Sequence, residues 1–179
     1  AEPDTRPPTP SADVPAEYAI RGFHSSTLAL TDAAPTAAVL TGQMGYTLAT
    51  ESGYRSRYTV AEGGPGTYVD LLTDPAIPRG LNGAGTIHHV AFRTPDDASQ
   101  VAARETLLEN SLHVSPVIDR AYFKSIYYRE PNGVLFEIAT DQPGFAIDEP
   151  VETLGSKLSL PPHLEAYRSE IEAGLPKLN

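Results

Sequence analysis

Two residues with good metal-binding side chains, His89 and Glu137, each lie within a short apolar run of the sequence. His89 belongs to Thr86-Ile-His-His-Val-Ala-Phe-Arg and Glu137 belongs to Val134-Leu-Phe-Glu-Ile-Ala-Thr. An ionised carboxylate in an apolar run costs several kcal/mol if it has no partner, so Glu137 is predicted to have one. A cation bound by this imidazole and this carboxylate would satisfy both groups. With a second histidine they would form the facial triad of a non-haem iron(II) site.

The two residues fall in the second of two sequence units that share one order of elements. In each unit an apolar strand leads into a helix, and three strand-like runs follow. The first unit is expected to have strands at 21–30, 46–50, 54–61 and 67–72 and a helix at 35–44, and the second is expected to have strands at 86–93, 113–118, 121–128 and 134–139 and a helix at 95–110. Pro95 is expected at the first helical position. The pattern predicts an α+β fold of two βαβββ modules, each a curved mixed sheet with its helix outside.

An alignment of the two units predicts that only one of them binds a metal. Counted back from the aspartate that follows each first strand, Ser25 corresponds to His89, so His24 is out of register with it. Asp70 corresponds to Glu137, because each begins a similar run that ends in Thr-Asp. Successive strand residues face opposite sides, so His24 and His89 should point to opposite faces. The first unit is therefore expected to be degenerate, with a vestigial polar site.

The composition narrows the class of protein. The chain has 179 residues, of which 40% are apolar, with no cysteine and a net charge of −10. The lack of cysteine excludes disulfides and thiolate metal sites, which suits a cytoplasmic protein. The acidic balance argues against nucleic acid as a partner. No apolar run approaches the roughly 20 residues that span a bilayer, so no membrane partner is expected.

Four segments are expected along the chain. Residues 1–19 are a proline-rich linker, 20–80 the first and degenerate module, 84–142 the second and metal-binding module, and 143–179 a tail. The tail is expected to contain a short amphipathic helix, opened by Pro161-Pro162, that packs on the sheet or on a neighbouring module. The sequence starts at Ala1 and its one methionine is Met44, which predicts a processed chain or a piece of a longer protein.

A repeated βαβββ unit with a first-strand histidine and a fourth-strand glutamate resembles the vicinal-oxygen-chelate superfamily, which includes glyoxalases, bleomycin-resistance proteins and extradiol dioxygenases. Four sequence motifs are more specific and resemble those of the hydroquinone-type ring-cleaving dioxygenases. They are Gly85-Thr-Ile-His-His-Val-Ala-Phe-Arg, Asp119-Arg-Ala-Tyr-Phe-Lys-Ser-Ile-Tyr-Tyr-Arg-Glu-Pro-Asn-Gly, Leu135-Phe-Glu-Ile-Ala-Thr-Asp and Leu158-Ser-Leu-Pro-Pro. The resemblance covers residues 20–178 and corresponds to the C-terminal half of a family with four such units.

By this resemblance His89 and Glu137 are two of three metal ligands, and the third is a histidine of the N-terminal half. The resemblance also marks His88, Arg120 and Tyr127 as groups around the metal. As a fixed cation, Arg120 would hold an anionic oxygen of the substrate or of bound superoxide. Tyr127 would donate a hydrogen bond to a phenolic oxygen, and His88 would move protons near neutral pH.

Each of these residues has a structural alternative. His89 and Glu137 could form a buried ion pair, and His88 could be satisfied by the backbone. Arg120 could pair with a neighbouring acidic residue and contribute little. Tyr127 lies among other aromatic residues, so ordinary strand packing competes with a role in the site.

The resemblance implies an enzyme that uses O2 to cleave a small aromatic diol of hydroquinone or catechol type at Fe(II), with Mn(II) as the alternative metal. The absent N-terminal half or a second copy of the chain would complete the site, and a homo-oligomer is expected. Two other functions stay open. One is another metalloenzyme of the superfamily, such as a glyoxalase-like isomerase or lyase, which would consume no oxygen. The other is a non-catalytic fragment or binding module, which would hold no stoichiometric iron.

Overall fold

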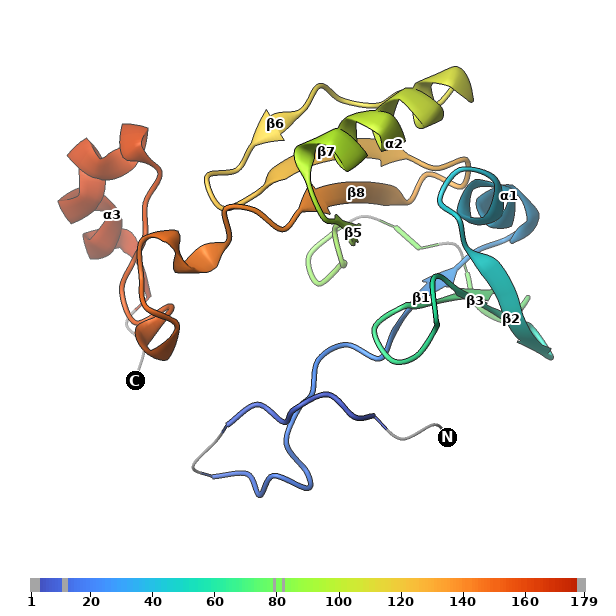
Figure 1. Ribbon diagram of the computed structural model, residues 1–179, viewed down its shortest axis with the longest axis horizontal. Coiled ribbons are helices and arrows are strands. Elements are labelled where there is room, and N and C mark those ends of the chain that lie inside the picture. Colours follow the sequence, from blue (N-terminus) through green and yellow to red (C-terminus); the bar gives the residue numbers. More distant parts are fainter. Residues whose placement is uncertain (1–3, 11–12, 79, 82, 177–179) are drawn as a thin grey trace.

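The computed structural model describes residues 4–10, 13–78, 80–81 and 83–176. Its strands form two separate four-stranded sheets, one from each sequence unit (Figure 1). The first unit contains β1 (Ser25–Ala29), α1 (Ala34–Gly42), β2 (Thr47–Ser52), β3 (Arg55–Thr59) and β4 (Tyr68–Leu72). The second contains β5 (Val90–Thr94), α2 (Asp97–Glu109), β6 (Ile118–Asp119), β7 (Lys124–Arg129) and β8 (Leu135–Thr140). The predicted α+β fold of two βαβββ units is confirmed.

The two sheets share one topology. The strand orders are β1-β4-β3-β2 and β5-β8-β7-β6, and in each sheet the first and fourth strands are parallel neighbours. The remaining neighbours are antiparallel, so both sheets are mixed. In Figure 1, α2 lies across β7 and β8 on the outer side of the second sheet. The opposite face of that sheet is therefore left for a site.

Alternation along β7 and β8 explains which residues face the helix. Ile126 and Tyr128 of β7 and Phe136 and Ile138 of β8 are buried in the core, together with Leu107 of α2. The residues between them point to the other face, because successive side chains of a strand alternate. The face of the sheet that packs on α2 thus forms part of the core. The opposite face, called the inner face below, therefore carries Ser125, Tyr127 and Glu137.

The start of helix α2 and the start of strand β5 differ in detail from the sequence prediction. Helix α2 is capped by Asp96, whose carboxylate accepts a hydrogen bond from the Ser99 backbone N–H at 2.8 Å. Pro95 therefore precedes the cap and is not the first helical residue as expected. Strand β5 begins only at Val90, so His89 lies in the extended segment just before the strand.

The predicted strand at 113–118 is largely absent from the described part of the chain. It is reduced to an isolated bridge between Val114 and Tyr128 and to the two-residue β6. The tail contains three short 3-10 helices and the helix α3 (Arg168–Gly174); the 3-10 helices are η1 (Phe145–Ile147), η2 (Val151–Thr153) and η3 (Pro162–Tyr167). Figure 1 shows α3 beside η3 and apart from both sheets. Of the two expected positions, packing on a neighbouring module stays a prediction.

A small polar junction connects the two units. The buried Glu130, which follows β7, accepts a hydrogen bond from the Thr36 hydroxyl of α1 at 2.5 Å. Asn132 donates to the same hydroxyl at 2.8 Å and to the Asp32 carbonyl at 2.9 Å. The turn after β7 is thereby attached to the first helix of the other unit. Among the described residues, no helix is both long and apolar enough to cross a membrane.

Candidate metal centre

The carboxylate of Glu137 lies in the middle of β8 and is almost fully buried, with 3% of the residue exposed. Its Oε1 atom accepts two hydrogen bonds from the neighbouring strand β7. One comes from the Ser125 hydroxyl at a very short distance, and the other from the Tyr127 hydroxyl at 2.9 Å. Tyr127 lies directly opposite Glu137 in the β7–β8 ladder, which explains the contact. One carboxylate oxygen is thus held by the sheet, and Oε2 is directed elsewhere.

Oε2 of Glu137 faces the imidazole of His89. The distance from His89 Nε2 to Glu137 Oε2 is 2.8 Å, and about a third of the His89 side chain is exposed. The second ring nitrogen of His89 contacts Nδ1 of His88 at 2.9 Å. The His89 ring also meets the Tyr127 ring edge to face, with centroids 6.1 Å apart. The predicted convergence of His89 and Glu137 is therefore present in the structure.

Arg120 reaches the same cluster through Tyr127. Its Nε and Nη2 atoms each lie 3.3 Å from the Tyr127 hydroxyl oxygen, and its guanidinium carbon lies 5.5 Å from the ring centroid. The backbone N–H of Arg120 donates to the Phe123 carbonyl at 2.9 Å, which holds the loop before β7 in place. Arg120 forms no ion pair with Asp119 or Glu130 within the described chain. The five residues singled out from the sequence therefore form one continuous chain of contacts.

The donor groups fit part of a metal site. An imidazole nitrogen and a carboxylate oxygen are ordinary ligands of divalent transition metals. Two ligands bound at about 2.1 Å and at a right angle to each other lie roughly 3 Å apart, close to the 2.8 Å between Nε2 and Oε2. No group of three His, Cys, Asp or Glu side chains able to hold an ion occurs in the described part of the chain. The described residues therefore bring together two groups that could serve as ligands, and a three-ligand site would require one more.

The buried carboxylate at the corresponding position of the first unit has different partners. Asp70, which is 1% exposed, forms ion pairs with Arg57 at 2.7 Å and Arg55 at 2.8 Å. Hydrogen bonds from Arg57, and then from Arg55, lower the pKa of Asp70 below its ordinary value. In the ladder Arg57 is opposite Asp70, as Tyr127 is opposite Glu137. Two cations of the chain itself thus neutralise the carboxylate.

The ladders confirm the alignment made from the sequence. Thr27 pairs with Asp70 and Ala91 pairs with Glu137, so the residues two positions earlier, Ser25 and His89, correspond. His24 packs instead on Tyr68, with ring centroids 5.4 Å apart.

Sequence reasoning missed the residues of the third strand of each unit. Ser125, Arg55 and Arg57 were not singled out, although all three touch the buried carboxylates. Their spacing could have identified them. Arg55 and Arg57 lie two positions apart in β3, and Ser125 and Tyr127 lie two positions apart in β7. Residues two apart on a strand share a face.

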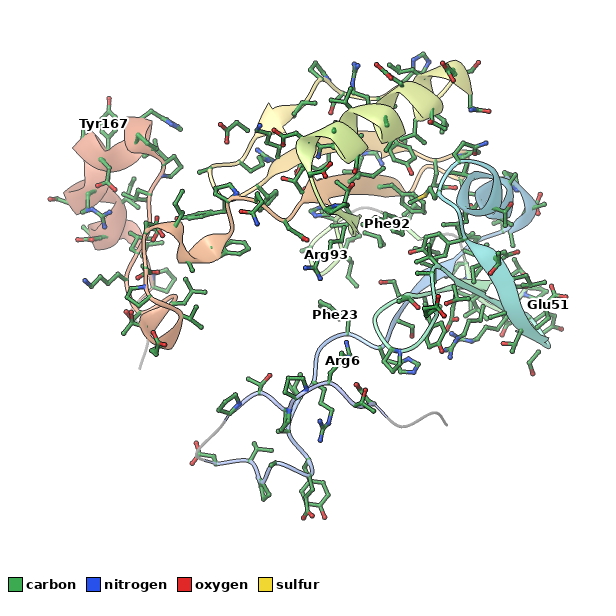
Figure 2. The ribbon with its side chains drawn as sticks, viewed as in Figure 1. Arg6, Phe23, Glu51, Phe92, Arg93 and Tyr167 are labelled. Carbon is green, nitrogen blue, oxygen red and sulfur yellow. The ribbon has the colours of Figure 1, made fainter. Side chains whose placement is uncertain are left out.

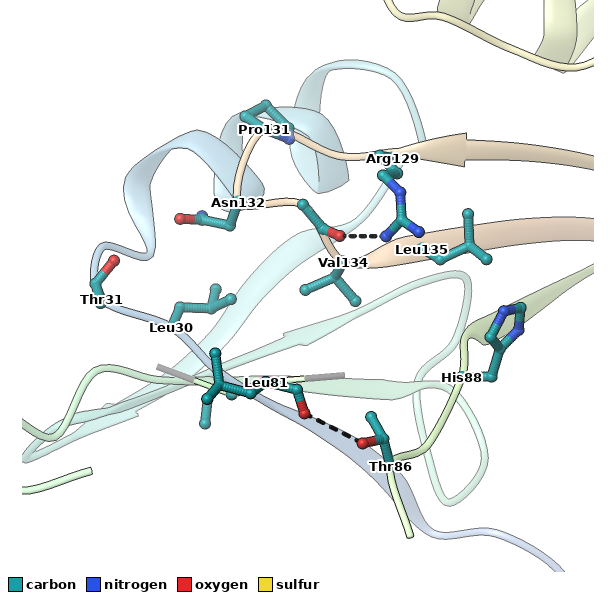
Figure 3. Close-up of a pocket in the computed structure, with 13 residues that line it drawn as sticks. Leu30, Thr31, Leu81, Thr86, His88, Arg129, Pro131, Asn132, Val134 and Leu135 are labelled. Atoms are coloured by element: carbon teal, nitrogen blue, oxygen red, sulfur yellow. Dashed lines mark hydrogen bonds between the residues drawn. The ribbon is translucent and has the colours of Figure 1, made fainter. Parts of the chain in front are cut away.

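Two cavities border the second sheet. One of about 500 Å³ is lined by His88, Arg129 and Leu135, by Leu30 of the first unit and by Leu81 of the segment between the units (Figure 3).

The other cavity, of about 670 Å³, lies between the N-terminal segment and β5. Arg6, Phe23, Phe92 and Arg93 are among its lining residues (Figure 2). Among the described residues that line this cavity, neither His89 nor Glu137 occurs, so the cavity is separate from that pair.

Comparison with known proteins places the chain in a family. The model of the Glyoxalase/Bleomycin resistance protein/Dioxygenase superfamily matches residues 22–138, which is more than half of the sequence. The chain belongs to this superfamily, as the resemblance seen in the sequence implied.

Particular relatives narrow the similarity. A Bacillus subtilis (strain 168) protein provisionally named ring-cleaving dioxygenase MhqO is 44% identical over 163 residues, which is 91% of this chain and 52% of the relative. The chlorohydroquinone/hydroquinone 1,2-dioxygenase of Sphingobium indicum is 34% identical over 169 residues, which is 92% of this chain and 52% of the relative. A crystal structure of a provisionally assigned dioxygenase from Bacillus subtilis aligns with a TM-score of 0.87 and 43% identity, over 93% of this chain and 53% of that one. The chain spans about half the length of the curated relatives it matches.

Proposed function

We propose that the protein containing this chain is a metal-dependent dioxygenase that cleaves a small dihydroxylated aromatic ring, with His89 and Glu137 as two of the metal ligands. The observation that carries the proposal is the 2.8 Å approach of His89 Nε2 to Glu137 Oε2 on the inner face of the second sheet. The relatives' names support ring cleavage, and one of them names hydroquinones as substrates. The metal we propose is Fe(II), with Mn(II) as the alternative.

A metal held by His89 and Glu137 would supply the means of bringing O2 and the ring substrate together and of passing electrons between them. The protein's part begins with Glu137, whose Oε1 is fixed by Ser125 and Tyr127, so that Oε2 alone is directed to the site. Such hydrogen bonds to a ligand orient it and contribute to metal affinity. Tyr127 thus uses its hydroxyl proton to hold Glu137. We propose that a phenolic oxygen of the substrate is bound by the remaining donors of Arg120.

Arg120 is suited to stabilise negative charge on an oxygen beside the metal. Its guanidinium has five donors, of which two approach Tyr127. The remaining donors are free to meet an oxygen that becomes anionic as the ring is attacked. In this proposal Arg120 stabilises charge and Tyr127 holds the arginine in place.

His88 is placed to exchange a proton with His89. The contact joins Nδ1 of one ring to Nδ1 of the other, so one of the two must carry the proton. If Nε2 of His89 binds a metal, its Nδ1–H donates to His88, and the tautomer of His89 is fixed. His88 also lines the 500 Å³ cavity, so it connects the ligand pair with a space large enough for an aromatic ring.

A third ligand must come from outside the described residues. We propose that it is supplied by an N-terminal half of the kind that the twofold longer relatives have, or by a second copy of the chain in a homo-oligomer. Such a ligand would approach from the side of His89, because the His89 side chain is partly exposed whereas Glu137 is buried.

Substitution of the proposed ligands tests the metal site. In the full-length protein, His89→Ala and Glu137→Ala are each expected to reduce bound iron from near stoichiometric to a few per cent, measured by elemental analysis after purification. His24→Ala is the matched control and should retain iron, because His24 packs on Tyr68 in the first unit. Normal iron content in either ligand variant would refute the assignment.

Oxygen consumption distinguishes the reaction from that of other superfamily members. A ring-cleaving dioxygenase takes up one O2 for each ring it opens, whereas a glyoxalase-like isomerase or lyase takes up none. We expect uptake, recorded with an oxygen electrode, when a hydroquinone is added to the iron-loaded full-length protein. Metal binding without uptake on any dihydroxylated ring would favour the isomerase or lyase.

A further inference from the structure

Arg129 lies one step along the sheet from the proposed ligand pair. In the β7–β8 ladder Tyr127 is opposite Glu137, and the next pair on the same face is Arg129 opposite Leu135. Two strand residues span about 6.6 Å, which is comparable with the length of a para-substituted aromatic ring. Arg129 is therefore placed where the far end of a ring would lie if its near oxygen met His89 and Glu137.

The space next to Arg129 is shaped for such a ring. Arg129 and Leu135 line the cavity of about 500 Å³ together with His88, which touches His89 (Figure 3). Leu30 and Leu81 supply apolar surface from the opposite wall. The lining thus combines apolar side chains with polar and cationic groups, and a concave space of this kind can bind a small molecule that has both apolar and polar parts.

The guanidinium of Arg129 has no acidic partner among the described residues. Within the described chain its Nη1 donates a hydrogen bond to the Gly133 carbonyl at 2.8 Å. By contrast, Arg55, Arg57 and Arg93 each form an ion pair with a carboxylate. In a chain with a net charge of −10, a cation that lines a cavity and forms no ion pair among the described residues is suited to bind an anion.

We propose that Arg129 is a specificity-determining residue that binds an anionic oxygen on the end of the ring substrate remote from His89 and Glu137. The inference rests on the proposed function, since it takes the near end of the ring to be held by that pair. The ligand chemistry it selects is an aromatic ring with a phenolic oxygen at one end and a carboxylate or phenolate at the other. Arg129 forms a charge-assisted bond to the second group, and the leucines cover the ring.

Two matched ligands test the proposal without turnover. 4-Hydroxybenzoate and 4-hydroxybenzamide differ in the charge of the para group, and each has a single hydroxyl. By calorimetry on the full-length protein, Arg129→Gln is expected to weaken binding of the carboxylate about tenfold or more and of the amide less than twofold. Arg129→Lys keeps the charge and should fall between the parent and the glutamine variant. Arg104→Gln, the control, removes a guanidinium that also bonds to one carbonyl, that of Ser115, outside this cavity, and should change neither affinity.

Several outcomes would overturn the proposal. These are an equal loss for both ligands in Arg129→Gln, an unchanged affinity for the carboxylate, a lysine variant as weak as the glutamine variant, or no binding of either ligand to the parent. Oxygen uptake on dihydroxylated rings is measured separately on the same proteins. Uptake by the parent with no selective effect of Arg129→Gln overturns this inference alone. Selective binding with no uptake on any ring overturns the proposed reaction alone.

Discussion

At the scale of single residues, the two oxygens of Glu137 have different partners. Oε1 is bound by Ser125 and Tyr127, and Oε2 faces His89. His89 and Glu137 were recognisable in the sequence because an ionisable residue in an apolar strand requires a partner. Ser125 was not recognisable, because a serine in a strand is unremarkable until the register places it next to a buried carboxylate.

Removal of the serine hydroxyl should destabilise the protein. In Ser125→Ala the buried Glu137 loses one of two donors to Oε1, and a buried charged group left short of a hydrogen bond costs about 1–3 kcal/mol. We expect a decrease of that size in the free energy of unfolding, measured by urea denaturation at pH 7. The matched control is Ser56→Ala, which removes a hydroxyl bound to the exposed Glu51 and should cost less than about 1 kcal/mol. Equal effects of the two substitutions would contradict the structural role given to Ser125.

At the scale of elements, the two units share one strand order but surround their buried carboxylates with different side chains. The strand order and the ladder positions agree, yet Arg55 and Arg57 surround Asp70 where Ser125 and Tyr127 surround Glu137. The sequence predicted the repeat, the strand and helix order, and the correspondence of Ser25 with His89. It did not predict the third-strand residues, because loops of unequal length hide which residues face each other across a ladder.

The Asp70 cluster should make stability depend on pH in the acid range. The lowered pKa of Asp70 means that the folded state prefers the ionised form, so its contribution is present above the ordinary pKa and is lost as the pH falls below it. At pH 7, Asp70→Asn is expected to reduce the free energy of unfolding on the order of 2 kcal/mol, since Arg55 is partly exposed. The difference from the parent should stay constant at pH 5 and shrink at pH 3 and below.

An exposed ion pair provides the control for this measurement. Asp141 pairs with Arg93, whose side chain is 82% exposed, so Asp141→Asn should cost less than about 1 kcal/mol at pH 7. A difference between Asp70→Asn and the parent that does not diminish at low pH would show that the ionised carboxylate is not the stabilising form.

At the scale of the whole molecule, Glu130 connects the units. It follows β7 of the second unit and is bound by Thr36 of the first. The sequence indicated the two units but not this contact, because Thr36 and Glu130 are far apart along the chain and each is ordinary in its own element. The tail was predicted to be helical, and it is, but its packing depended on tertiary contacts that amphipathic spacing alone does not specify.

The junction should contribute measurably to the stability of the molecule. Thr36→Val keeps the shape but removes the hydroxyl that serves Glu130 and Asn132, so a cost of about 1–3 kcal/mol is expected. The control is Thr41→Val on the same helix, where the exposed hydroxyl bonds only to the Ala37 carbonyl. Urea unfolding followed by far-UV and near-UV circular dichroism would report the loss, and an effect no larger than that of Thr41→Val would contradict the role of the junction.

The internal ion pairs of Asp70 have a consequence for the response of the protein to chelators. The first unit contains its own counter-ions, so its acidic residue remains neutralised whether or not transition metals are in supply. In the function proposed above, His89 and Glu137 of the second unit bind an external ion instead. Treatment with EDTA should therefore loosen only one of the two halves of this chain and leave the other as a folded support onto which the depleted half can reassemble when iron returns.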